Sequence, residues 1–127
     1  MRLFLVRHAE AAPGEPDDLR PLTSAGRDVA RALAQRLAGE HPEAVVSSPL
    51  LRARETAAVI AEASGVAAET DERLAPGATA DDLRAAAAGR GETIVAVGHE
   101  PDCSEIVLAL TGEEVRFPAG AVHEVRL

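Results

Sequence analysis

The stretch Thr93-Ile94-Val95-Ala96-Val97-Gly98-His99 decides the class of fold. Its first five residues are apolar or β-branched and glycines flank the run, which is the pattern of a buried strand. A histidine follows where this strand ends. Residues 2–6 repeat the arrangement, because a short apolar run there leads directly into Arg7-His8. We therefore predict two buried strands, each with basic or imidazole side chains at its carboxyl end.

Helical patterns alternate with the strands along the chain. Val29, Leu33 and Leu37 recur every four residues, which indicates the apolar face of a helix. Ser48 can cap the next helix, with Pro49 at its favoured first position. Four helices are expected, at about residues 24–38, 49–64, 80–89 and 101–111.

Strands are expected between these helices and at the C-terminal end. The pattern predicts them at residues 2–6, 44–46, 66–72, 93–97 and 121–127. Such alternation favours an α/β fold, in which helices cover both faces of a mainly parallel sheet. No internal repeat or composition break divides the chain, so residues 1–127 are predicted to form one three-layer α/β/α domain.

The composition is that of a folded protein outside the membrane. Apolar residues make up 46% of the 127 residues and charged residues 27%, a balance that excludes intrinsic disorder. No apolar run approaches the roughly 18 residues that span a bilayer. The apolar run that begins at Leu3 is too short for a signal peptide. We expect a soluble, cytoplasmic protein without a membrane partner.

Several residue types that carry specific chemistry are missing. The chain has no lysine, so all 13 basic residues are arginines, and the net charge is −8. A single cysteine, Cys103, excludes disulfides and multi-cysteine metal sites. Acidic charge and the lack of Trp and Tyr exclude a nucleic-acid partner. Phosphate binding would therefore depend on a local cluster of arginines.

Three predicted strands end in residues that suit such a cluster. Arg7-His8 follows the first strand, Ser47-Ser48-Pro49 leads to Arg52 after the second, and His99 follows the strand at 93–97. Ligands of open α/β sheets bind at the carboxyl ends of the strands. A helix N-terminus at residues 48–52 would add N–H donors for an anion. Together these residues predict a phosphate pocket.

Four motifs resemble the histidine phosphatase (phosphoglycerate-mutase-like) superfamily, in particular its small SixA-type phosphohistidine phosphatases. They occur in order along essentially the whole chain, and the ending Phe117–Val122 is similar as well. The motifs are Leu5-Val6-Arg7-His8-Ala9-Glu10-Ala11, Arg20-Pro21-Leu22-Thr23 with Gly26, Ser47-Ser48-Pro49-Leu50-Leu51-Arg52-Ala53 with Thr56-Ala57, and Val97-Gly98-His99-Glu100-Pro101.

The resemblance implies a mechanism for the predicted pocket. His8 would attack phosphorus and form a phosphohistidine intermediate, which water then hydrolyses. Arg7 and Arg52 would bind the phosphoryl oxygens with their planar guanidinium groups. His99 would donate a hydrogen bond to the same group. No cofactor or metal is implied, and a metal bound by His8 and His99 would be repelled by the adjacent Arg7.

The sequence departs from the family pattern in two places. Ala9 replaces the glycine that usually follows the Arg-His pair. Larger members carry an acidic residue after the third strand, whereas Asp81 and Asp82 here are better explained as first-turn residues of a helix that starts with a Thr79 capping box. Asp17 or Asp18, in the polar loop at 9–18, is an alternative acid.

Other polar residues have simpler interpretations. Arg20 either borders the pocket or pairs with Asp17 or Asp18. Arg54 is interpreted as a surface charge, because it lies two positions from Arg52 on the same helix. His41 is assigned to a solvated loop and His123 receives no role. Cys103 is interpreted as a small core residue.

Two enzymatic functions follow from the resemblance. The favoured one is hydrolysis of protein phosphohistidine, with a phosphotransfer domain of a signalling relay as partner. The alternative is a phosphomonoesterase or phosphoanhydride hydrolase that acts on a small phosphorylated metabolite. A phosphate-binding module without catalysis is a third possibility, against which the presence of His8, Arg7, Arg52 and His99 argues.

Overall fold

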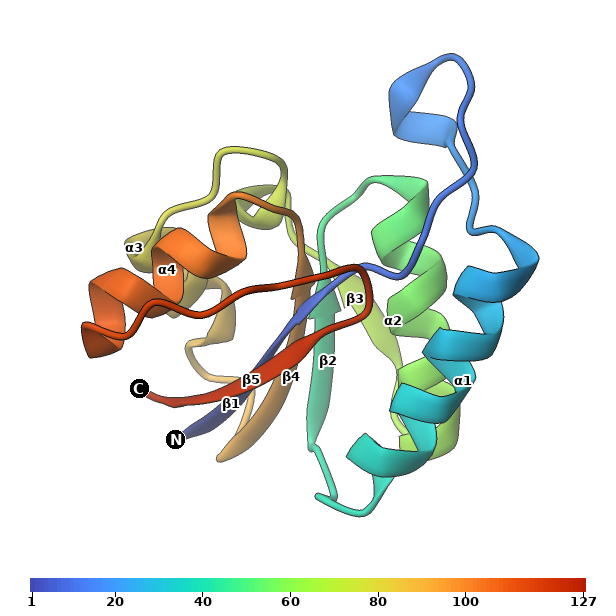
Figure 1. Cartoon of the computed structure of the whole chain (residues 1–127). Helices are drawn as coiled ribbons and strands as arrows, with labels where there is room; N and C mark the ends of the chain where they lie inside the picture. The colour runs from blue at the N-terminus through green and yellow to red at the C-terminus, as the bar shows by residue number, and fades with distance from the viewer.

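The computed structural model describes residues 1–127 as a five-stranded sheet between two layers of helices (Figure 1). The strand order is β3-β2-β4-β1-β5. Four strands are parallel, and the last runs antiparallel to the first at one edge. The strands are β1 (Arg2–Arg7), β2 (Ala44–Ser47), β3 (Ala68–Thr70), β4 (Thr93–Gly98) and β5 (Val122–Arg126). The predicted α/β fold is therefore confirmed.

Successive side chains of each strand point to opposite faces of the sheet, which divides the hydrophobic core into two halves. Leu3 and Leu5 of β1 face one helical layer, and Phe4 and Val6 face the other. This follows from the two-residue period of a strand. The helices are α1 (Ser24–Ala38), α2 (Leu51–Ser64), α3 (Ala80–Ala87) and α4 (Asp102–Thr111), with α1 and α2 on one face and α3 and α4 on the other (Figure 1). None of them is long and apolar enough to cross a bilayer.

The start of α2 differs from the sequence prediction. The helix begins at Leu51, and Leu50, with an extended backbone, occupies the cap position without a side-chain hydrogen bond. Ser48 lies too far upstream to cap the helix, and its hydroxyl instead accepts a hydrogen bond from the Leu50 amide at 3.2 Å and contacts His99. Ser48 and Pro49, which the sequence predicts as the cap and the first residue of the helix, therefore lie in a tight turn that precedes it.

Smaller corrections concern the other elements. α3 ends at Ala87, two residues before Gly89, and β3 keeps only the centre of the predicted strand at 66–72. Val29 is exposed, because the buried face of α1 is formed by Ala30, Leu33, Ala34 and Leu37. The Thr79–Asp82 capping box predicted for α3 is present.

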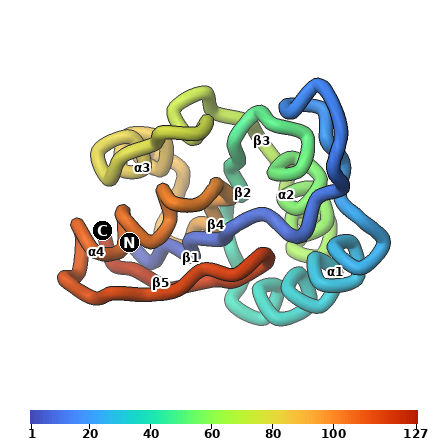
Figure 2. Tube along the Cα trace, turned by 45° about the horizontal axis from the view of Figure 1, so that its top comes forward, coloured from blue at the N-terminus to red at the C-terminus, as the bar shows by residue number.

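The carboxyl ends of β1, β2 and β4 lie together, because β4 pairs with both of the others. Figure 2 shows this end of the sheet tilted toward the viewer. The loop between β1 and α1 rises above it and contains a short 3-10 helix, η1 (Asp17–Leu19), which packs against α2. The site is built from these four segments.

Candidate active site

Three strand ends bring the predicted site residues together. His8 follows β1, Arg52 lies in the first turn of α2, and His99 follows β4. Their side chains are buried, with His8 and Arg52 each 8% exposed and His99 4% exposed. The imidazole rings of His8 and His99 lie 5.2 Å apart between centroids. The structure thus forms one cluster from residues that are up to 91 positions apart in sequence.

The hydrogen bond made by His8 leaves one ring nitrogen free. Its Nδ1 lies 2.7 Å from the carbonyl oxygen of Ala9. A carbonyl only accepts hydrogen bonds, so Nδ1 carries the proton and Nε2 keeps its lone pair. The Ala9 amide in turn donates to the Thr56 hydroxyl at 3.1 Å, and that hydroxyl donates to the Arg52 carbonyl at 2.8 Å. The ring orientation is therefore tied to α2.

Burial lowers the pKa of His8, and the nearby charges of Arg52, Arg7 and Arg20 lower it further, although the Ala9 hydrogen bond acts in the opposite direction. The ring is consequently neutral at physiological pH. A neutral imidazole with an unprotonated Nε2 is a competent nucleophile.

His99 is also neutral. Burial lowers its pKa to about 4, and the electrostatic influence of the nearby His8 and Arg52 side chains acts in the same direction. Its Nε2 lies 2.7 Å from the Ser48 hydroxyl. Its Nδ1 is buried and has no hydrogen-bond partner within the protein.

The two arginines of the cluster both donate to backbone carbonyls, and Arg7 also keeps an unsatisfied donor. Arg7 donates from one terminal nitrogen to the Phe117 carbonyl at 3.0 Å, and its buried Nε has no partner. Arg52 donates to the Asp17 carbonyl at 2.9 Å and to its carboxylate at 3.3 Å. Buried polar groups normally find partners, so the unpaired Nε–H of Arg7 suits this site to an anion rich in acceptor oxygens.

Asp17 lies at the rim of the cluster. Its carboxylate pairs with Arg20 at 2.9 Å as well as with Arg52. Arg20 first, and then Arg52, lower the pKa of Asp17. A carboxyl group held in its ionised form is a poor proton donor at neutral pH. Arg20 also donates to the Ala12 carbonyl at 2.9 Å, so it shapes the loop.

The remaining acidic candidates make no contact with the two histidines. Asp82 closes the capping box of α3, and Asp81, which is highly exposed, faces Arg84 at 3.5 Å. Asp102 is buried at the start of α4 and accepts hydrogen bonds from the amides of Gly77 and Ala78. Asp18 is exposed and makes no side-chain hydrogen bond or ion pair. No carboxyl group therefore contacts either histidine.

Three contributors to the cluster were not predicted as such from sequence. They are the hydroxyls of Ser48 and Thr56 and the backbone carbonyl of Phe117. The motif around Arg52 contains both hydroxyl residues, but the pattern does not tell a cap from a contact across strands. A backbone carbonyl carries no sequence signal at all.

The residues given simpler interpretations lie outside the cluster. Arg54 is exposed and donates to the Pro49 carbonyl at 2.9 Å. Cys103 is 1% exposed, and burial raises the pKa of its thiol, so it is an inert core residue. His41 is exposed in the loop before β2, and His123 stacks edge-on with Phe117.

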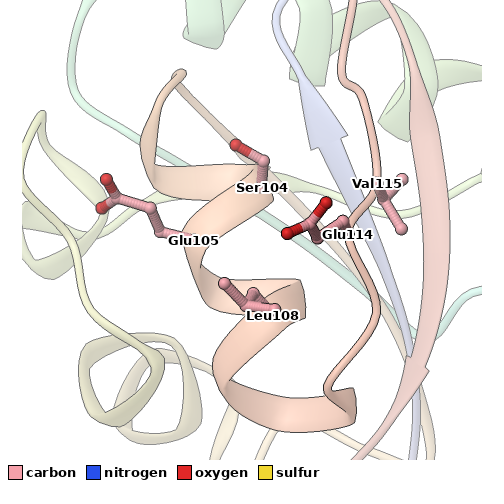
Figure 3. A pocket seen from close by; sticks show the side chains of 5 residues that line it. All are labelled: Ser104, Glu105, Leu108, Glu114 and Val115. Atoms are coloured by element: carbon pink, nitrogen blue, oxygen red, sulfur yellow. The ribbon is translucent and has the colours of Figure 1, made fainter.

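A separate hollow lies on the outer side of α4 (Figure 3). It is lined by α4 and the segment after it, through Ser104, Glu105, Leu108, Glu114 and Val115. Two glutamates and no basic side chain make it unsuited to a phosphate. This hollow is therefore no second phosphate site.

Known proteins share this fold and these motifs. The family model of the histidine phosphatase superfamily (branch 1) matches residues 3–76. An uncharacterised protein of Picosynechococcus sp. is 35% identical over 140 residues, which cover 99% of this chain and 85% of that protein.

Solved structures give the same result. The protein histidine phosphatase SixA complexed with tungstate superposes with a TM-score of 0.87 at 30% identity, over 100% of this chain and 88% of that one. A SixA-type protein from Agrobacterium tumefaciens superposes with a TM-score of 0.82 at 28% identity, over 97% and 89% of the two chains. The sequence match, the sheet order and the cluster at its carboxyl end agree, and the chain belongs to the histidine phosphatase superfamily.

Proposed function

We propose that this protein hydrolyses phosphohistidine on a partner protein through a covalent intermediate at His8. The observation that carries the proposal is the 2.7 Å contact between His8 Nδ1 and the Ala9 carbonyl. It leaves Nε2 as a free nucleophile in a neutral ring beside Arg7, Arg52 and His99. A phosphohistidine on a phosphotransfer domain of a cytoplasmic signalling relay is the substrate we favour.

In the first step, the lone pair of His8 Nε2 forms a bond to phosphorus. The bond between phosphorus and the substrate nitrogen breaks, and the leaving imidazole departs neutral because its other ring nitrogen is protonated in the reactive form. Arg7 and Arg52 bind the non-bridging oxygens, whose charge they neutralise. The Ala9 carbonyl stabilises the positive charge that develops on the His8 ring, through the hydrogen bond from Nδ1.

In the second step, water attacks the phosphorus of phospho-His8. The bond from phosphorus to Nε2 breaks and its electron pair returns to the ring, while the water proton leaves to solvent or to the phosphate product. His8 regains its starting tautomer, because Nδ1 remains protonated against Ala9. Each of these steps uses only groups of this chain, the substrate and water.

The acidic residues of the site support an N–P substrate over an ester. An alkoxide leaves poorly unless an acid protonates it, whereas a protonated imidazole needs no such donor. No carboxyl group contacts His8 or His99, and Asp17 is held ionised by Arg20 and Arg52. The structural similarity to a protein histidine phosphatase that binds tungstate, a tetrahedral oxyanion like phosphate, points in the same direction.

A side-by-side hydrolysis assay tests this proposal. The substrates are a phosphohistidine-bearing phosphotransfer domain, phosphoramidate, p-nitrophenyl phosphate and a simple alkyl phosphate. We expect rapid cleavage of the N–P bonds, slower cleavage of the nitrophenyl ester and negligible cleavage of the alkyl ester. An alkyl phosphate cleaved as fast as phosphohistidine would overturn the proposal and favour the metabolite phosphatase.

A further inference from the structure

We propose that Ser48 is a positioning residue that sets the tautomer of His99, so that His99 presents an N–H from Nδ1 to the phosphoryl group. This inference rests on the proposed phosphoryl transfer. It assigns a role to a hydroxyl that sequence alone suggested as a helix cap. The geometry that supports it is the chain of contacts from Leu50 through Ser48 to His99.

The hydrogen bonds of Ser48 determine where its own proton points. Ser48 is completely buried, and its Oγ accepts from the Leu50 amide at 3.2 Å. Its other polar neighbour is Nε2 of His99, at 2.7 Å. A hydroxyl has a single proton, and a buried donor without an acceptor is costly. The Ser48 proton is therefore directed to Nε2 of His99, which acts as the acceptor.

The acceptor role of Nε2 determines the state of the whole His99 ring. A neutral imidazole carries one proton, so an unprotonated Nε2 places that proton on Nδ1. The low pKa of His99, which burial lowers to about 4, keeps the ring neutral. Nδ1 is the buried nitrogen that has no partner within the protein. The Ser48 contact thus turns this nitrogen into a donor.

The opposite tautomer would be unfavourable in two ways. If Nε2 carried the proton, the buried Ser48 hydroxyl would accept twice and its own proton would have no partner. Nδ1 would then offer a lone pair to a phosphoryl oxygen, and two acceptors repel each other. The His8 ring, 5.2 Å away between centroids, would keep its nucleophile while losing the donor across the site.

The neighbouring Ser47 provides a matched control. It is as buried as Ser48, at 1% exposed, and its hydroxyl donates to the Ser48 carbonyl at 2.9 Å. Ser47→Ala therefore removes a buried hydroxyl from the same turn without touching His99. Ser48→Cys keeps the size of the side chain and weakens the donor.

The ring state can be measured directly by ¹⁵N NMR of histidine-labelled protein at pH 7.5. The His99 resonances are assigned by their loss in His99→Gln. We expect wild type and Ser47→Ala to show a protonated Nδ1 and an unprotonated Nε2. Ser48→Ala should shift His99 to a mixture of tautomers, and Ser48→Cys should lie between.

Kinetics supply the second readout, with p-nitrophenyl phosphate as substrate. Ser48→Ala should lower kcat by about 10-fold with little change in KM, less than the about 10²- to 10³-fold loss that follows removal of a complete oxyanion donor. Ser47→Ala should retain most of the activity. An unchanged kcat in Ser48→Ala would contradict the proposal, as would an equal loss in Ser47→Ala.

The NMR result separates this inference from the proposed function. A wild-type His99 protonated on Nε2, or a Ser48→Ala ring that stays fully protonated on Nδ1, would overturn the role of Ser48 whichever substrate the enzyme cleaves. The wild-type measurement is decisive even if Ser48→Ala fails to fold. Failure of the N–P substrate panel would instead overturn the proposed function and leave the tautomer intact.

Discussion

The two ends of the sheet treat their arginines differently. At the amino end, Arg2 of β1 is paired with Glu40 at 2.8 Å and with Glu124 at 3.0 Å. Five residues later on the same strand, Arg7 bonds a backbone carbonyl and keeps a buried nitrogen unpaired. One strand thus begins with a neutralised cation and ends with an available one.

A second pair of arginines repeats the contrast. Arg90, just before β4, pairs with Glu69 and lies 3.6 Å from Asp71. Arg52 at the other end meets a single carboxylate, that of Asp17, at 3.3 Å. In a chain with net charge −8, carboxylates are abundant, so their scarcity around Arg7 and Arg52 creates a local positive site. The difference teaches that an arginine is available to bind an anion only where few carboxylates surround its guanidinium group.

The largest effect is expected from His8→Ala, which removes the nucleophile. Turnover of every phosphorylated substrate should fall to background, while far-UV circular dichroism and the unfolding midpoint show a folded protein. His41→Asn is the matched control, because His41 is exposed and has a positive φ of 53° that asparagine tolerates. Substantial turnover in His8→Ala would show that the nucleophile lies elsewhere.

Arg52→Lys tests the carboxyl-end arginines. Lysine keeps the charge and loses the planar fork, so kcat/KM should fall by about 10²-fold. Arg54→Lys and Arg2→Lys should change kcat/KM by less than about twofold, because Arg54 is exposed and Arg2 lies at the opposite end of the sheet. Equal losses at Arg52 and Arg2 would remove the contrast between the two ends.

Asp17→Asn tests the same contrast by removing the one carboxylate that pairs with Arg52. The variant keeps the backbone carbonyl that Arg52 binds at 2.9 Å and loses the carboxylate charge. We expect tungstate, measured as an inhibitor, to bind a few-fold more tightly, with hydrolysis of phosphohistidine retained. Asp18→Asn serves as control, because Asp18 makes no ion pair. A drop of kcat by 10²-fold or more in Asp17→Asn would instead identify it as the general acid.

The smallest effect concerns stability and pH. The pKa of His99 is lowered to about 4 in the folded protein, against its ordinary value of 6.5 when unfolded. Between these values the unfolded chain binds more protons, so the free energy of unfolding falls as pH decreases from 6.5 toward 4. His99→Gln should make the free energy of unfolding less dependent on pH between 6.5 and 5, because up to roughly one proton fewer is taken up on unfolding. An identical slope in the variant, measured by urea unfolding, would show that His99 is not buried as a neutral ring.

The sequence predicts the fold well where local patterns are strong. The runs at 2–6 and 93–97 are mostly apolar, and the second is rich in β-branched residues; both form buried strands inside the sheet. The short exposed β3 was predicted too long, because its residues carry no clear alternation. Val29 was wrongly placed on the buried face of α1 because it lies four residues before Leu33. Four residues are slightly more than one helical turn, and the buried face continues instead through the small residues Ala30 and Ala34.

The site was predictable in position and less so in its contacts. The ends of three strands lead directly to His8, Arg52 and His99, since parallel strands align their carboxyl ends. The roles of Ser48 and Asp17 depend on contacts across 51 and 35 positions, respectively. A local motif cannot carry such information. Ser48 was therefore interpreted as a cap, and the sequence could not decide whether Asp17 or Asp18 is an alternative acid or the partner of Arg20, which the structure shows to be Asp17.

The central claim is that Nε2 of His8 becomes phosphorylated, and trapping the phosphorylated enzyme tests it most directly. The protein is mixed with a phosphohistidine-bearing domain, quenched rapidly in alkali, where phosphohistidine is stable, and the phosphorylated residue and ring nitrogen are identified by mass spectrometry and ³¹P NMR. The Ala9 hydrogen bond at Nδ1 predicts a single phosphoryl group on Nε2 of His8. Phosphorylation at Nδ1, at another residue, or turnover with no protein-bound phosphate would contradict the account.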